Sequence, residues 1–188
     1  GPYGGHSLWE PLKRVMVRQP GLPGSETDWS DLAYFHAPDL ERSNAEHAAF
    51  VELLVESGAE VVIAPPDEPG YLDAVFCYDP SLMTSAGAIL LRPGKPQRVD
   101  EVAFHARIYA DIGIPILGAI EAPGTAEGGD TLWIDDDTLA VGRGYRTNRE
   151  GIRQLQTILD PLGVQVVAYD LAHYHGPGEC LHLMSFIS

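Results

Sequence analysis

One order of predicted elements recurs along the chain, and this recurrence limits the possible folds more than any other feature of the sequence. A strand, a second strand, a helix and a third strand are predicted within residues 73–120, and the same order returns within 127–169. A further helix, predicted at 43–57, lies between strands predicted at 12–18 and 61–64. Helices therefore begin at intervals of roughly 50 residues, a period typical of propeller and barrel repeats.

Short local patterns predict the individual elements. Ser43 and Glu46 have the spacing of a capping box, as do Thr147 and Glu150, so each pair is expected to begin a helix. Apolar runs predict the remaining strands, at 74–78, 88–91, 114–120, 131–134, 139–141, 164–169 and 180–187. The modules are accordingly placed at about 12–64, 73–120 and 127–169, with the start of the next at 180–188. We therefore expect a single α/β domain, 1–188, that is incomplete at its C-terminus.

The amino-acid content favours a folded chain that attracts cations. Apolar residues make up 45% of the sequence, which supplies enough surface for burial to exclude wholesale disorder. The formal net charge of −15 repels nucleic-acid phosphates and anionic membranes, so neither partner is expected. Cys77 and Cys180 are far apart and form no disulfide framework, so a reducing cytoplasm is the expected location.

A carboxylate and an arginine recur together in the two modules. Asp73 lies 19 positions before Arg92, and Glu127 lies 19 positions before Arg146. These residues form ion pairs on two similar hairpins, or they line a central pocket. Such a pocket would bind a molecule that is cationic at one end and carries a carboxylate at the other.

Two short acidic segments have both a structural and a functional interpretation. The segment 127–130, Glu-Gly-Gly-Asp, fits a turn, and it equally fits a close approach of the backbone to a ligand. Asp79 precedes a proline, where its side chain would cap a turn or contact a ligand.

Histidines gather near the end of the sequence. The cluster of His173, His175, Glu179, Cys180 and His182 permits a zinc site, but the tetrahedral ligand spacings are absent. His182 lies between two leucines in the predicted strand 180–187, which places it on the face opposite to theirs. A histidine there is either structural or available for proton transfer.

Six short motifs follow one another in a characteristic order: DAVFCYDP at 73–80, LRPG at 91–94, EAPG at 121–124, EGGD at 127–130, RTN at 146–148 and CLHL at 180–183. Together they resemble the dimethylarginine dimethylaminohydrolase (dimethylargininase) group of the guanidine-modifying, or pentein, superfamily. The chain is similar to this group from Leu12 to its last residue. The resemblance implies a pentein-type α/β propeller, in which five modules of ββαβ type circle a central site.

The resemblance also implies an activity, the hydrolysis of the guanidinium group of Nω-methylated arginine to citrulline and methylamine or dimethylamine. In that chemistry a cysteine forms a thiouronium intermediate with the guanidinium carbon, an amine leaves, and water releases the product without a metal or organic cofactor. His182 matches the general acid and base of the group. Glu127 matches the carboxylate that holds and polarises the guanidinium.

Four further residues match substrate contacts of the group. Asp73 and Asp79 match contacts to the substrate, and Arg92 and Arg146 match the pair that binds its α-carboxylate. Carboxylates beside a guanidinium keep it cationic, while arginines neutralise the far end of the molecule.

The sequence departs from the group at two points. Tyr78 stands where the group has a glutamate, which leaves the substrate open. The group's nucleophilic cysteine falls beyond residue 188, so the chain by itself is expected to be inactive, and to associate with itself or with the missing segment. Arginine deiminases and amidinotransferases share the fold and remain alternatives, as does a non-catalytic module that binds guanidino compounds.

Overall fold

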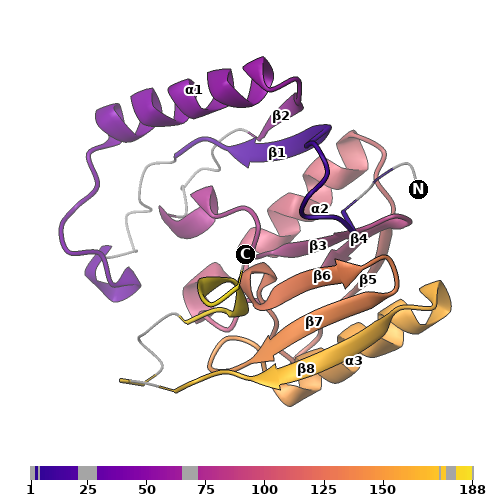
Figure 1. Ribbon diagram of the computed structural model, residues 1–188. Coiled ribbons are helices and arrows are strands. Elements are labelled where there is room, and N and C mark those ends of the chain that lie inside the picture. The colour runs from indigo at the N-terminus through magenta and orange to yellow at the C-terminus, as the bar shows by residue number, and fades with distance from the viewer. Residues whose placement is uncertain are drawn as a thin grey trace. The chain divides into compact units, whose positions relative to one another are not determined.

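Two units, formed by different parts of the chain, make up the computed structural model (Figure 1). The smaller unit is Glu10–Cys77, and the larger unit comprises Gly1–Trp9 and Tyr78–Ser188. The structure describes residues 3, 5–20, 29–64, 72–173, 175–176 and 181–187. Within these ranges, no helix has both the length and the apolar character needed to cross a membrane.

The smaller unit is built on two parallel strands. β1 (Arg14–Arg18) pairs with β2 (Glu60–Ala64), and α1 (Leu40–Glu56) connects them. Short 3-10 helices at Trp29–Leu32 and Leu72–Val75 complete the unit. The predicted strands at 12–18 and 61–64 are thereby confirmed.

The first helix begins earlier than its predicted capping box. Asp39 is the N-cap, and its carboxylate accepts a hydrogen bond of 3.1 Å from the backbone N–H of Arg42. The N–H of Ser43 already donates to the carbonyl of Asp39 at 2.9 Å, so Ser43 lies inside the first turn. The start predicted at Ser43 is wrong because the aspartate in front of the helix satisfies its free N–H groups first.

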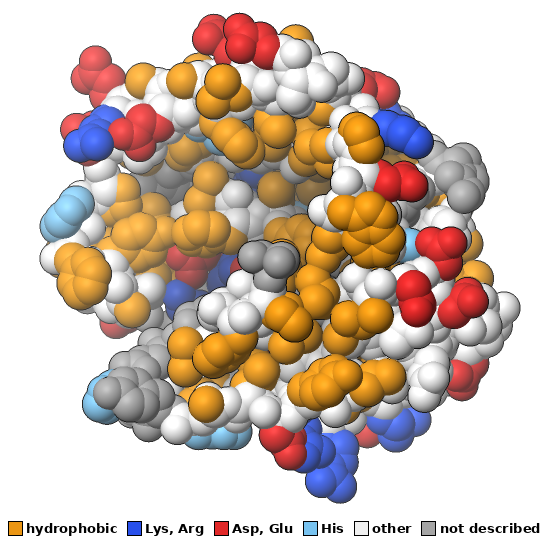
Figure 2. Space-filling model, in the orientation of Figure 1, with side chains coloured by type: hydrophobic (Ala, Val, Ile, Leu, Met, Phe, Trp, Pro, Cys, Tyr) orange, Lys and Arg blue, Asp and Glu red, His pale blue; other side chains and the backbone are white. Residues whose placement is uncertain are grey.

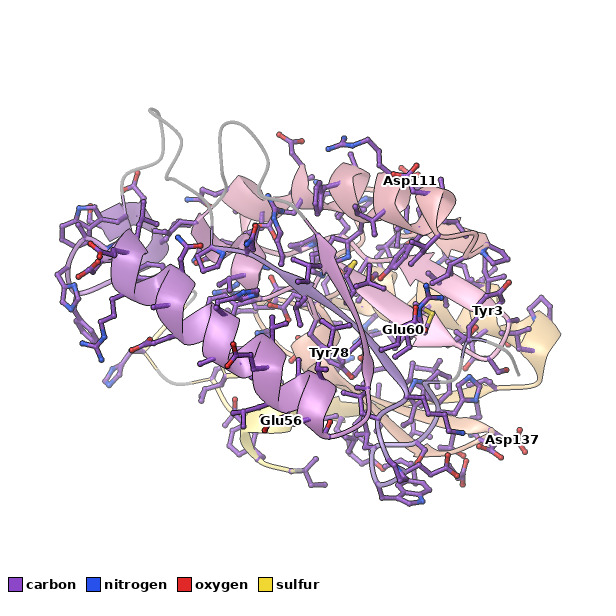
Figure 3. The ribbon with its side chains drawn as sticks, turned by 90° about the horizontal axis from the view of Figure 1, so that it is seen from above. Tyr3, Glu56, Glu60, Tyr78, Asp111 and Asp137 are labelled. Carbon is purple, nitrogen blue, oxygen red and sulfur yellow. The ribbon has the colours of Figure 1, made fainter. Side chains whose placement is uncertain are left out.

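The larger unit contains the predicted repeat. Its first module consists of β3 (Ser81–Thr84), β4 (Gly87–Leu90), α2 (Glu101–Asp111) and β5 (Ile116–Ala119). Its second module consists of β6 (Thr131–Asp135), β7 (Thr138–Arg143), α3 (Arg149–Leu159) and β8 (Gln165–Asp170). In each module an antiparallel hairpin is followed by a parallel third strand, so the order strand, strand, helix, strand is confirmed. In Figure 3, Asp111 marks the end of α2 and Asp137 the turn between β6 and β7.

The two modules share one hydrophobic core. Leu155 and Leu159, on the predicted apolar stripe of α3, are fully buried there together with Leu139 and Val141 of β7. Ile89 and Leu91 of the first module and Trp133 of β6 belong to the same cluster. This core fixes the segments that carry the polar residues described below.

Three further predicted elements differ from the structure. Residues 74–78 were expected to form a strand, but the N–H of Phe76 bonds to the carbonyl of Asp73 at 3.0 Å and closes a helical turn, and the hairpin begins at Ser81 instead. The N-cap of α3 is Asn148, not Thr147. The described part of 180–187 contains a 3-10 helix, Leu183–Ser185, in place of a strand, and Cys180 lies outside the described residues.

Candidate active site

Three side chains from distant parts of the sequence converge in the larger unit. Asp79 comes from the turn before β3, Glu127 from the segment before β6, and His182 from the residue before the last 3-10 helix. One nitrogen or oxygen atom of each lies within 4.8 Å of those of the other two. All three had been selected from the sequence, and the structure brings them together.

Glu127 is the buried centre of this group. Its side chain is 0% exposed, and its Oε1 accepts hydrogen bonds from the backbone N–H of Gly94 at 2.9 Å and from Arg146 at 3.2 Å. Nε2 of His182 lies 3.3 Å from its Oε2. A buried carboxylate requires such compensation, because an unpaired charge in the interior is strongly unfavourable.

Asp79 pairs with Arg98, which is not among the site residues expected from the sequence. Nη1 of Arg98 donates to Asp79 at 2.7 Å, and Nη2 donates to Glu101 at 2.9 Å. Burial acts to lower the pKa of Arg98, but the hydrogen bonds and charges of Glu101 and Asp79 outweigh it and raise this pKa above its usual value. Arg98 is therefore a permanent cation beside the site. Its spacing of three residues from Glu101, at a helix start, was the signal in the sequence.

Asp130 lies on the Nδ1 side of His182, and Thr147 binds the other oxygen of Asp130. Oδ1 of Asp130 lies 3.1 Å from Nδ1 of His182, and Oδ2 accepts the hydroxyl of Thr147 at 2.6 Å. From the sequence, Asp130 is expected only as part of the EGGD segment, a turn or a ligand approach, and Thr147 only as a helix cap within the RTN motif. Their functional position results from the fold, which places the start of β6 beside the start of α3.

The two glycines between Glu127 and Asp130 permit the close packing of the site. A Cβ on Gly128 would lie 2.0 Å from the carbonyl oxygen of Tyr78, and one on Gly129 would lie 2.8 Å from the ring of His182. The sequence allows either a turn or a close approach of the backbone to a ligand at this segment. In the structure the backbone of the two glycines closely approaches Tyr78 and His182 of the same chain.

The remaining predicted site residues occupy other positions. Nη1 of Arg92 reaches the carbonyl of Gly124 at 3.5 Å, and its backbone bridges to Ala126. Asp73 is buried in the smaller unit, in the 3-10 helix Leu72–Val75, so its predicted pairing with Arg92 stays a prediction. Arg146, in contrast, pairs with Glu127 as the recurrent spacing indicated.

The histidine cluster divides in the structure. The ring of His173 contacts that of Tyr145 edge to face at 4.5 Å, while His182 belongs to the site. Glu179 and Cys180 lie outside the described residues. In the described part of the chain, the one group of residues whose spacing suits a metal ion is Asp79, Glu127 and His182, and the two carboxylates in it already bind arginines.

Tyr78 lies next to Asp79 in the larger unit, and Figure 3 labels it near the middle of the view. The residue is 46% exposed, and its partial burial raises the pKa of the phenol; the charge of Asp79 adds to this rise, while a hydrogen bond with Thr131 opposes it. The phenol therefore stays neutral and offers a hydroxyl where a glutamate would offer a charge.

Two ββαβ modules, followed by a histidine between the buried carboxylates of Glu127 and Asp130, are the features of this α/β chain to compare with the arginine deiminase family. The model of this family, described as "Arginine deiminase", matches residues 72–187, and the chain belongs to it.

Within the family, the chain is similar to dimethylarginine dimethylaminohydrolases. The enzyme of that name from Pseudomonas aeruginosa is 33% identical over 153 residues, which cover 81% of this chain and 59% of the relative. The resemblance found in the motifs is thereby confirmed. The chain spans about three fifths of the length of this relative.

Solved structures show the same fold. A cysteine-to-serine variant of the Pseudomonas aeruginosa enzyme, in complex with citrulline, superimposes with a TM-score of 0.72 at 31% identity and covers 92% of this chain and 64% of that one. An amidinotransferase of saxitoxin biosynthesis from Microseira wollei has a TM-score of 0.73 at 16% identity. The superposition covers 97% of this chain and 65% of the amidinotransferase chain. At this low identity it supports the fold alone. The pentein-type α/β fold is therefore confirmed, whereas a closed propeller is not part of the described structure.

Proposed function

We propose that this chain carries the guanidinium-binding and proton-transfer part of an enzyme that hydrolyses Nω-methylated arginine to citrulline and methylamine or dimethylamine. The observation that carries the proposal is Glu127, a fully buried carboxylate in contact with both Arg146 and His182. The names of the similar enzymes indicate the same substrate class.

The carboxylates would bind the guanidinium end of the substrate. In this structure Glu127 binds the guanidinium of Arg146, and Asp79 binds that of Arg98. Both carboxylates therefore already form the charged hydrogen bond that a substrate guanidinium would need. A substrate that takes over one of these bonds frees an arginine for its own carboxylate. Arg146 is the nearest candidate for this second contact, and Arg92 and Asp73 remain proposed contacts.

His182 would transfer the protons. A thiolate forms a bond to the guanidinium carbon, the bond from carbon to the methylated nitrogen breaks, and His182 donates a proton to the leaving amine. Water then adds to the same carbon and gives one proton back to His182. The carbon–sulfur bond breaks as the C=O bond of citrulline forms, the second proton of the water passes to solvent, and the released amine takes up a proton from solvent. Protons and charges balance over the cycle, and no metal or organic cofactor takes part in it.

The thiolate is proposed to come from a segment that residues 1–188 do not include. Cys77 lies in the smaller unit, where its Sγ donates to the carbonyl of Met16 at 3.3 Å. The chain by itself is then inactive but binds guanidino compounds, and the cytoplasmic location stays a prediction.

Citrulline release from dimethylarginine tests the proposal. We expect none from the 188-residue chain and turnover when a fragment with the family's cysteine is added. Turnover by the chain alone that is lost in Cys180→Ser would show Cys180 to be the nucleophile. Ammonia from plain arginine, without dimethylamine from dimethylarginine, would favour the deiminase alternative.

A further inference from the structure

The residues around His182 form a closed ring of polar contacts in the larger unit, made of hydrogen bonds and one ion-pair contact. The backbone N–H of Glu127 donates to Oγ1 of Thr147 at 3.1 Å, and this hydroxyl donates to Oδ2 of Asp130 at 2.6 Å. Oδ1 of Asp130 lies 3.1 Å from Nδ1 of His182, whose Nε2 lies 3.3 Å from Glu127. Both ring nitrogens of the histidine therefore face a carboxylate.

The two carboxylates differ in their other partners. Glu127 has the charged guanidinium of Arg146 and the N–H of Gly94. Asp130 has the hydroxyl of Thr147 and the N–H of Leu183, both of them neutral. Among the described residues, the imidazole is the one group in contact with Asp130 that can carry a positive charge.

This difference decides which nitrogen can give up its proton. Asp130 is 1% exposed, so the loss of the proton on Nδ1 would leave a buried carboxylate with neutral donors only. After the loss of the proton on Nε2, the carboxylate of Glu127 is still paired with the charged guanidinium of Arg146. The carboxylate of Asp79, the third acidic group near the ring, is bound by Arg98 and does not alter this balance.

We propose that Asp130 and Thr147 are positioning residues that keep a proton on Nδ1 of His182, so that proton exchange with the substrate takes place at Nε2. This inference rests on the function proposed above. The hydroxyl of Thr147 has one proton, which it gives to Asp130 while it accepts the N–H of Glu127. It therefore fixes the Asp130 carboxylate relative to the segment that carries the second carboxylate.

Nuclear magnetic resonance of the 188-residue chain, with 15N-labelled histidine, tests the proposal. Long-range 1H–15N correlation spectra show which ring nitrogen is protonated when the imidazole is neutral. The chain has seven histidines, so a His182→Gln sample identifies the signals of interest. We expect the proton on Nδ1 in the wild type and a mixture of both forms in Asp130→Asn, which keeps the shape of the side chain and removes its charge.

Two further variants complete the experiment. Thr147→Val removes the hydroxyl at nearly constant volume, and we expect a smaller shift toward the second form. Asp137→Asn removes an exposed carboxylate from the turn between β6 and β7, and we expect the wild-type spectrum. If Asp130→Asn does not fold, the wild-type and Thr147→Val spectra decide the question.

A wild-type proton on Nε2, or an unchanged spectrum in a folded Asp130→Asn, would overturn the proposal. Calorimetric binding of dimethylarginine to the same samples separates it from the proposed function. If the proton is on Nδ1 and no ligand binds, the positioning role stands and the proposed function fails.

Discussion

Ile120 and Tyr169 occupy equivalent positions in the two modules, but Ile120 is 5% exposed and Tyr169 is 52% exposed. The strand register shows the equivalence. In the first module Ser81 pairs with Leu90, which also pairs with Ala119. In the second module Thr131 pairs with Val141, which also pairs with Ala168. Ile120 and Tyr169 follow these alanines directly. One face of the repeat is therefore covered in the first module and open in the second.

The open face carries an apolar cavity. Ile120 is buried in the core that both modules share, whereas Tyr169 lines a cavity of about 390 Å³ with Leu132, Ala140 and Phe186. Figure 2 shows hydrophobic side chains gathered over β6, β7 and β8. An exposed apolar surface of this kind favours association, because its burial removes apolar area from water.

We expect the isolated chain to associate with itself through this face. Tyr169→Glu places a charge on the face and should shift the chain toward the monomer. Sedimentation velocity over a range of concentrations measures the effect. Phe35→Glu, at a side chain that is 99% exposed in the smaller unit, is the matched control. Equal association of both variants would contradict the assignment to this face.

Loss of the charge on Glu127 should weaken the binding of dimethylarginine. Glu127→Gln keeps the shape of the side chain but replaces a charge-assisted contact, so we expect at least about a tenfold rise in Kd. Isothermal titration calorimetry measures it, with Asp137→Asn as the control for one lost negative charge. An unchanged Kd would remove Glu127 from the binding site.

A methyl group on Gly129 should displace His182. The added Cβ would lie 2.8 Å from the imidazole ring, which must move away from Asp130. We expect Gly129→Ala to change the ring signals of His182 and to lower the Tm. Gly144→Ala is the matched control, because its Cβ would meet its nearest atom, in Leu171, at an ordinary 3.5 Å. Wild-type ring signals in Gly129→Ala would show that the packing is not as tight as the structure indicates.

Arg98 should contribute strongly to stability. Arg98→Gln removes the guanidinium that bonds to both Asp79 and Glu101 in the interior, so we expect a loss of about 3–5 kcal/mol in the free energy of unfolding. Urea denaturation measures it. Arg153→Gln breaks an exposed pair of the same three-residue spacing with Glu150, and it should have little effect because water screens that pair. Similar losses for the two variants would contradict the role of burial.

The family and the repeated module could be predicted from the sequence because they depend on local patterns. The apolar stripe that contains Leu155 and Leu159 needed only helical spacing, and both residues are in the core. The pair of Glu127 and Arg146 was indicated by a recurrent spacing and is present. Predicted element boundaries were wrong where another side chain capped the helix. At α1 the carboxylate of Asp39, four residues before Ser43, accepts the backbone N–H of Arg42.

The sequence by itself determined the order of the elements, the glycines that permit close approach, and the acidic and basic residue types available to the site. Only the tertiary structure decided which of these residues meet. Arg98 binds Asp79 across 19 positions, and Asp130 meets His182 across 52. Spacing along the chain cannot give such contacts, because they depend on how the connecting segments of one module, and the segment that follows β8, fold back in three dimensions. Burial then makes each of these charges require its partner.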